Sequence, residues 1–114
     1  MKESTIVLIN GLNFESIVMQ AKKPVLVACM DLEFGCENQI SVIKTVAEEQ
    51  QSQVQFCLVE VDYQRRFMEK FLIPGTPTFL VFEKGMEKGQ MMGETDSEAL
   101  NNFLKQTLPN LYPV

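Results

Sequence analysis

Two apolar stretches, Val-Leu-Val-Ala-Cys-Met at residues 25–30 and Val-Gln-Phe-Cys-Leu-Val-Glu-Val at residues 54–61, establish the fold class of this chain. The first is apolar at every position, and only Gln55 and Glu60 interrupt the second. A strand with one solvated face alternates apolar and polar residues, whereas a strand covered on both faces does not. We therefore expect two central strands of a sheet that carries helices on both sides.

A helix is predicted between these strands, over residues 37–51. Its apolar residues Ile40, Ile43, Val46 and Ala47 recur at helical spacing and form one buried stripe. Strand, helix and strand in this order form a βαβ unit, in which the two strands are parallel and the crossover is right-handed.

The remaining segments extend this unit to the order β-α-β-α-β-α-β-β-α. Further strands are expected at residues 5–9, 78–82 and 86–92, and further helices at 14–20 and 63–71, with a last helix that buries Ala99, Leu100, Phe103 and Leu104. Thr95-Asp96-Ser97-Glu98 reads as a capping box at the start of the last helix. No repeat or linker interrupts the order, so 114 residues suit one domain, 1–114.

The composition excludes several classes of function. The net charge is −5, from 10 basic and 15 acidic residues, and an acidic surface repels the phosphates of nucleic acids. Histidine is absent, which removes Ser/His and Cys/His nucleophile pairs and a frequent transition-metal ligand. We expect no nucleic-acid partner, no metal and no organic cofactor.

The sequence also gives an expectation for location. Residues 6–9 form an apolar run too short for the hydrophobic region of a signal peptide, and no stretch approaches the length of a membrane span. We expect a cytoplasmic protein with no membrane partner.

Several short motifs carry a resemblance to a known family. They are Asn13-Phe14-Glu15, Lys23-Pro24-Val25-Leu26-Val27, Val61-Asp62, Ile73-Pro74-Gly75-Thr76-Pro77-Thr78-Phe79, Phe82-Glu83-Lys84-Gly85 and Gly93. In this order and at this spacing they resemble the thioredoxin family over essentially the whole chain. The resemblance implies the thioredoxin fold of the α/β class, with a central mixed sheet of about five strands flanked by about four helices.

The chain departs from the family where the redox motif should lie. Thioredoxins carry Trp-Cys-Gly-Pro-Cys there, whereas residues 31–37 read Asp-Leu-Glu-Phe-Gly-Cys-Glu and hold one cysteine, Cys36. Counting back from Asp62 and Pro77 aligns Cys36 with the second, resolving cysteine and Glu33 with the nucleophile.

Counting forward from Val25 gives a different register, with the nucleophile at Phe34 and the resolving cysteine at Glu37. The two counts differ by one residue, so this loop is one residue shorter than the family's. We prefer the backward count, because it aligns a cysteine with a cysteine. Neither register aligns Cys36 with the family's first cysteine.

Three further positions depart from the family. The buried acid that assists proton transfer aligns with Ala28, the lysine paired with it aligns with Leu58, and the tryptophan at the strand end aligns with Met30. These groups tune thiol reactivity in the family.

Cys36 is the candidate single thiol, expected in the first turn of a helix. Backbone amides at a helix start favour a thiolate, and the neighbouring carboxylates of Glu33 and Glu37 oppose one. A reactive thiol and an unreactive leftover both remain open. Cys29 and Cys57 are expected to be inert core residues on the central strands, with a Cys29–Cys36 disulfide as a minor alternative.

The resemblance also implies a substrate-binding surface. The Thr76–Pro77 peptide bond is expected to be cis, so that the backbone of Thr76 can pair with an extended polypeptide. The candidate substrate-binding residues are Glu33, Phe34, Gly35, Thr76, Pro77 and Gly93.

Two functions follow from these residues. The first is an atypical thiol–disulfide protein that lacks the first cysteine of the CxxC motif and acts through one thiol or by binding polypeptides beside Pro77. Its expected partners are polypeptides or protein thiols and disulfides, with glutathione as a further candidate. The alternative is a purely non-catalytic binding module. The sequence leaves open whether the protein is an enzyme, and it disfavours dithiol catalysis.

Overall fold

The computed structural model describes residues 5–33 and 35–112. Along the chain lie the strand β1 (Ile6–Ile9), the π-helix η1 (Glu15–Met19), β2 (Val25–Cys29), the helix α1 (Glu37–Gln50), β3 (Gln55–Val59), the 3₁₀ turn η2 (Val61–Tyr63), α2 (Gln64–Lys70), β4 (Thr78–Glu83), β5 (Met86–Met92) and α3 (Ser97–Thr107). Every strand predicted above is present, with ends that differ by two residues at most.

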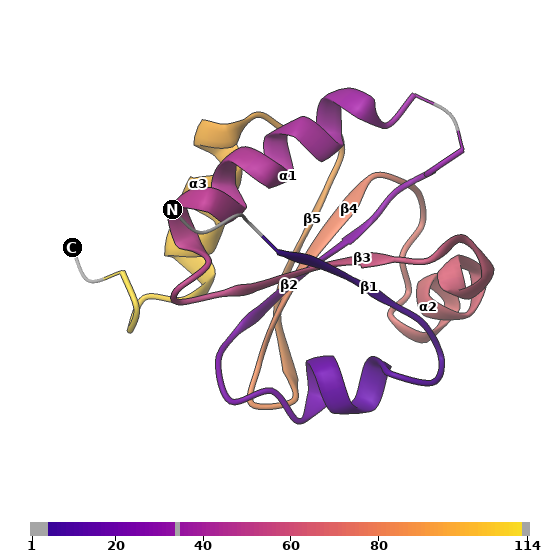
Figure 1. Ribbon diagram of the computed structural model, residues 1–114, viewed down its shortest axis with the longest axis horizontal. Helices are drawn as coiled ribbons and strands as arrows, with labels where there is room; N and C mark the ends of the chain where they lie inside the picture. Colours follow the sequence, from indigo (N-terminus) through magenta and orange to yellow (C-terminus); the bar gives the residue numbers. More distant parts are fainter. Residues whose placement is uncertain (1–4, 34, 113–114) are drawn as a thin grey trace.

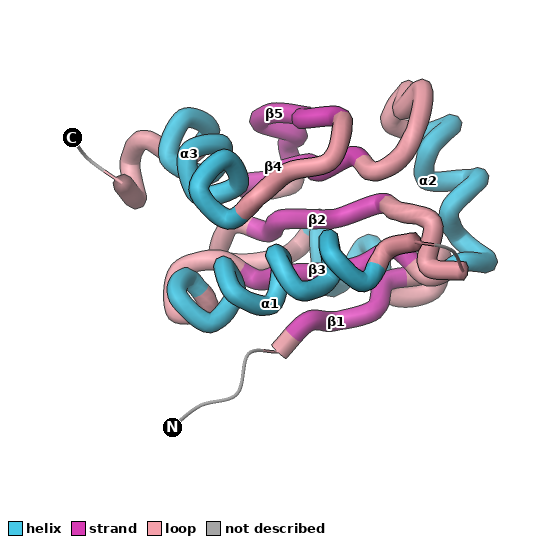
Figure 2. The backbone as a smooth tube through the Cα atoms, turned by 90° about the horizontal axis from the view of Figure 1, so that it is seen from above, coloured by secondary structure: helices cyan, strands magenta, loops and turns pink. Residues whose placement is uncertain are grey.

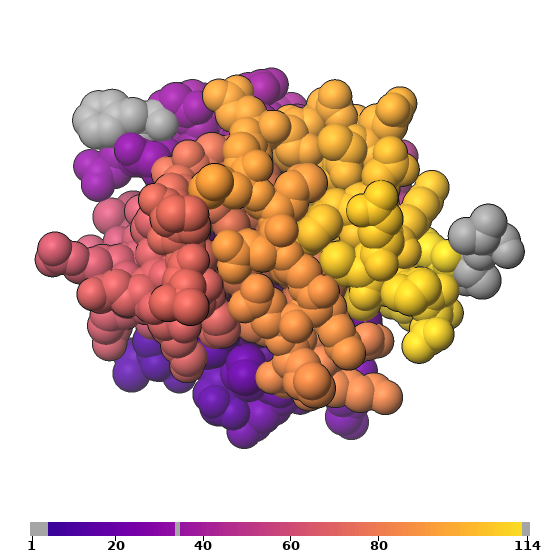
Figure 3. Space-filling view, turned by 180° about the vertical axis from the view of Figure 1, so that it is seen from behind, coloured from indigo at the N-terminus to yellow at the C-terminus, as the bar shows by residue number. Residues whose placement is uncertain are grey.

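The five strands form one mixed sheet in the order β1-β3-β2-β4-β5, which can be followed across Figure 2. β1, β3 and β2 run parallel, and β4 and β5 run antiparallel to their neighbours. The βαβ unit joins β2 to β3 through α1, as the unbroken apolar stretches predict. β5 is an edge strand, and it crosses the face seen in Figure 3 between α2 and α3.

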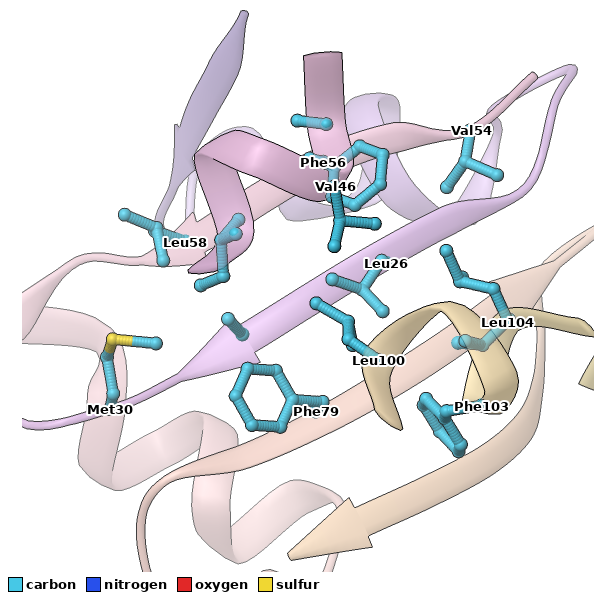
Figure 4. Packing of buried hydrophobic residues seen from close by; sticks show 14 of the residues in the cluster. Leu26, Met30, Val46, Val54, Phe56, Leu58, Phe79, Leu100, Phe103 and Leu104 are labelled. Carbon is cyan, nitrogen blue, oxygen red and sulfur yellow. The ribbon is translucent and has the colours of Figure 1, made fainter. Parts of the chain in front are cut away.

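Helices cover both faces of the sheet (Figure 1). α1 and α3 pack on one face, where Leu26, Phe56 and Phe79 from the strands meet Val46 and Leu100 from the helices (Figure 4). η1 and α2 pack on the other face, where aromatic side chains gather: Phe14, Tyr63, Phe67, Phe71 and Phe82. Every residue of β2 is buried because both of its faces are covered.

The topology brings three segments to one end of the sheet. β2 ends at Cys29, and the chain passes through residues 30–36 into the start of α1. β4 is antiparallel to β2, with Thr78 opposite Cys29, so β4 begins where β2 ends. β5 ends at Met92 beside Thr78. The loops before α1, before β4 and after β5 therefore converge.

None of the helices in the described part of the chain is long and apolar enough to cross a membrane.

Candidate functional site

Cys36 lies at the N-cap of α1, one residue before the first helical turn. Its backbone has φ −98° and ψ −2°, and its carbonyl accepts a hydrogen bond of 2.9 Å from the N–H of Ile40. Gly35, with φ +67°, supplies the left-handed turn into the helix, a conformation that glycine adopts without strain. The Cys36 side chain is 8% exposed and packs with the apolar core beneath α1.

The loop before β4 holds the second part of the site. The Thr76–Pro77 peptide bond is cis. The Thr78 hydroxyl donates to the Gly75 carbonyl at 2.7 Å, and the Pro77 carbonyl accepts from the N–H of Gly93 at 2.8 Å. Thr76 is exposed, and its backbone N–H and C=O have no hydrogen-bond partner among the described residues.

A small pocket of about 130 Å³ joins these parts. Its lining comprises Met30, Asp31, Gly35, Cys36, Gln39, Thr76, Pro77 and Glu94. Four residues singled out from the sequence therefore meet: Gly35, Cys36, Thr76 and Pro77. Gly93 contacts Pro77 through its backbone and lies just outside the lining.

The other two candidate residues do not line this pocket. Glu33 is exposed, and its backbone N–H donates to the Asp31 carboxylate at 3.0 Å. Phe34 lies outside the described residues, so its predicted role remains a prediction.

Gln39 is a site residue that the sequence analysis missed. Its side chain is 4% exposed, its amide donates to the Thr95 carbonyl at 3.0 Å, and its amide oxygen accepts from the Thr95 N–H at 3.0 Å. This paired contact ties the start of α1 to the loop after β5. In the sequence, Gln39 is a polar residue next to the apolar stripe of the helix, a position typical of a solvent-facing side chain. Its partner Thr95 is 56 residues away, so no local pattern indicates the contact.

The pocket is also acidic, which was not predicted from the sequence. Asp31 and Glu94 are exposed carboxylates on two different loops, and both line it. No lysine or arginine is part of the lining. The two acids are 63 positions apart in the chain, so only the fold places them around one opening.

Cys29 and Cys57 lie on the opposite side of the sheet from Cys36. Both have 0% exposure and pack with the residues under η1 and α2, whereas Cys36 packs under α1. Burial raises the pKa of the Cys29 thiol to about 11 and that of Cys57 to about 12. All three cysteines are free, so the alternative of a Cys29–Cys36 disulfide is wrong: the sheet separates the two side chains.

The core below Cys36 is apolar. Ala28 and Leu58 are neighbours in the β2–β3 register, and both belong to the same buried cluster as Cys36. Met30 belongs to this cluster too and lies at its edge in Figure 4. These positions therefore supply no acid or amine that could move a proton to or from the thiol. Among the described residues, no three His, Cys, Asp or Glu side chains are placed to share a metal ion.

Comparison with known proteins agrees with this architecture. The sequence profile of the family described as Thioredoxin matches residues 5–106. The thioredoxin of Pseudomonas aeruginosa is 28% identical over 100 residues, which cover 87% of this chain and 93% of that protein.

Two longer proteins are also similar to this chain. The bifunctional thioredoxin reductase/thioredoxin of Mycobacterium leprae is 28% identical over 100 residues, covering 87% of this chain. The protein disulfide-isomerase erp38 of Neurospora crassa is 29% identical over 99 residues, covering 82% of this chain. The matched regions span only 22% and 27% of those two proteins.

Proposed function

Because this chain belongs to the thioredoxin family, we propose that it binds polypeptides at the pocket beside Pro77 and exchanges disulfides with them through a single thiol, that of Cys36. One observation carries the proposal: Cys36 and Thr76 line the same pocket. A thiol and a free peptide edge are thus available to one ligand.

Binding would use the backbone of Thr76. Thr76 is an exposed residue and its N–H and C=O are unpaired within the described residues, so an extended segment can add to this edge by main-chain hydrogen bonds. The bond from Gly93 to Pro77 and the bond from Thr78 to Gly75 hold the edge in place. A pre-organised edge binds a flexible segment at a lower entropic cost than a mobile loop does.

Exchange would begin when the Cys36 thiolate attacks one sulfur of a substrate disulfide. A new disulfide then joins Cys36 to that sulfur, and the second substrate sulfur leaves as a thiolate. Cys29 and Cys57 cannot resolve this intermediate, since both are buried across the sheet.

An external thiol must therefore complete the cycle, and glutathione is the candidate we propose. Its thiolate attacks the Cys36 sulfur and releases the remaining substrate thiolate, leaving Cys36 joined to glutathione. A second glutathione restores the Cys36 thiol and departs as oxidised glutathione. Each turn thus converts one substrate disulfide to two thiols and two glutathiones to their disulfide.

A purely non-catalytic binding module is the second candidate function. The low exposure of Cys36 and the apolar core below it favour this alternative, because a reactive thiol needs access and a stabilised thiolate.

Reduction of an insulin-type disulfide substrate, with and without glutathione, separates the two functions. We expect turnover that depends on glutathione and is abolished in Cys36→Ser. The matched control is Cys57→Ala, which removes a buried thiol remote from the pocket and should retain turnover. Binding of a labelled extended peptide without cysteine, measured by fluorescence anisotropy, should survive Cys36→Ser.

The outcomes are distinct. Peptide binding without any turnover would establish the non-catalytic module and reject the thiol chemistry. Turnover that persists in Cys36→Ser would assign the chemistry to another group. If the folded wild-type protein shows neither peptide binding nor turnover, the proposed function is wrong.

A further inference from the structure

Two different loops each contribute an acidic side chain to the lining of the pocket. Asp31 lies on the loop after β2 and Glu94 on the loop after β5, and both are exposed where they line the opening. Glu37, in the first turn of α1, and Glu33 are also exposed and neighbour pocket-lining residues in the sequence, although neither lines the pocket. A ligand in the pocket therefore meets carboxylates from two loops of the chain.

The described basic side chains of α2 lie away from this pocket. Arg66 lies over the ring of Tyr63, 5.3 Å from its centroid, and Lys70 lies 4.9 Å from the centroid of Phe14. Arg65 lines a separate hollow with Met68. None of them lines the pocket beside Pro77, so its carboxylates have no cationic neighbour within the lining.

An exposed apolar side chain, that of Met92, lies close to the loop that carries Thr76. Met92 is 58% exposed, and its sulfur lies 3.9 Å from the position that a side-chain Cβ would occupy on Gly75, next to Thr76. An extended segment paired with Thr76 would pass this thioether, whose flexibility lets it contact side chains of varied shape.

We infer that the preferred polypeptide ligand is a cationic extended segment, with lysine or arginine on both sides of the residue that faces Cys36. This inference rests on the proposed function, because it names the substrate class of the same pocket. Exposed carboxylates raise the association rate of a cationic ligand and disfavour acidic ones, and salt screens both effects.

The experiment uses two labelled ten-residue peptides with serine at the central position. They are identical except that four lysines in one are glutamines in the other. The test variant is Asp31→Asn with Glu94→Gln; the substituted asparagine keeps a side-chain oxygen that can accept from the Glu33 N–H. The control variant is Glu48→Gln with Glu49→Gln, which removes the same charge at the far end of α1.

In low salt we expect the wild-type protein to bind the lysine peptide at least about fivefold more tightly than the glutamine peptide, as charge complementarity requires. The preference should fall to less than about twofold in high salt, since the Debye length shrinks. The Asp31→Asn, Glu94→Gln variant should lose the preference in low salt, and the Glu48→Gln, Glu49→Gln variant should keep it.

Equal binding of the two peptides by the wild-type protein would overturn this inference and leave the proposed function standing. Equal loss of preference in the test and control variants would also overturn it, by tracing the preference to net charge. Binding of neither peptide would instead reject the proposed function, and this inference with it.

Discussion

At the scale of single residues, the three cysteines differ in surroundings rather than in chemistry. Cys36 occupies the N-cap position of α1 and lines a pocket, whereas Cys29 and Cys57 point from central strands into the opposite core. A buried thiol cannot ionise without desolvating its charge, which is why the pKa of Cys57 is raised to about 12. The candidate reactive thiol thus lies at a helix start next to a pocket, whereas the two thiols with raised pKa values lie on central strands.

The raised pKa values predict a pH dependence of stability. The ordinary pKa of a cysteine thiol is 9.0, so well below that pH both thiols are protonated in the folded and the unfolded chain. Between pH 9.0 and about 11 to 12 the unfolded chain loses these protons while the folded chain keeps them, so the free energy of unfolding falls.

Urea unfolding at several pH values tests this dependence. The fall above pH 9.0 should be shallower in Cys57→Ala than in the wild-type protein, because one of the buried thiols is gone. Cys36→Ala, which leaves the thiols of Cys29 and Cys57 on the central strands in place, is the control. An identical slope in wild-type and Cys57→Ala would contradict the prediction.

At the scale of elements, helix ends show where local sequence rules apply and where they do not. The capping box was predicted from Thr95, but Asp96 is the N-cap of α3, and its carboxylate accepts from the N–H of Ala99 at 2.8 Å. Both side chains are suitable caps. The Thr95 backbone instead pairs with the side chain of Gln39, and its hydroxyl donates to the Asp96 carbonyl at 3.2 Å.

The residue that follows α2 has a backbone conformation that is unfavourable for its side chain. Leu72 has φ +55° and is 86% exposed. It follows the C-cap residue Phe71, and the N–H of Ile73 donates to the Met68 carbonyl at 2.8 Å, a Schellman arrangement that favours glycine at position 72.

We therefore expect Leu72→Gly to stabilise the fold by roughly 0.5–1 kcal/mol, because relief of left-handed strain exceeds the entropic cost of glycine. Leu72→Ala is the matched control: it keeps the strain and loses no burial, so its stability should change little. Chemical denaturation measures both variants. Destabilisation by Leu72→Gly would show that this leucine contributes a contact or that the turn is not strained.

At the scale of the whole molecule, the site is an assembly of three loops that are distant in sequence. The paired hydrogen bonds between Gln39 and Thr95 join the start of α1 to the loop after β5 across 56 positions. They place Glu94 on the same opening as Cys36. The shape of this site therefore depends on hydrogen bonds between distant segments as well as on the residues that line it.

Replacing Gln39 should therefore affect both stability and binding. Gln39→Leu leaves the partly buried N–H and C=O of Thr95 without partners, which costs about 1–3 kcal/mol. It should also weaken peptide binding, because the loop that carries Glu94 loses its anchor. Asn38→Ala, an exposed neighbour on the same helix, is the control and should change neither quantity. Unchanged stability of Gln39→Leu in thermal unfolding would contradict this role.

Local sequence was sufficient to predict the strands and helices, and the resemblance to the thioredoxin family implied how they form one mixed sheet. Cys36 was expected in the first turn of a helix and lies one residue earlier, at the N-cap of α1. Burial pattern and turn residues are local properties, so residues 25–30 and 54–61 predict central strands without knowledge of their partners. The folded chain was needed to see that Asp31 and Glu94 share an opening, that Gln39 is buried, and that Cys29 and Cys36 face opposite cores. These features depend on which distant segments meet, and that is set by packing of the whole chain rather than by spacing within one element.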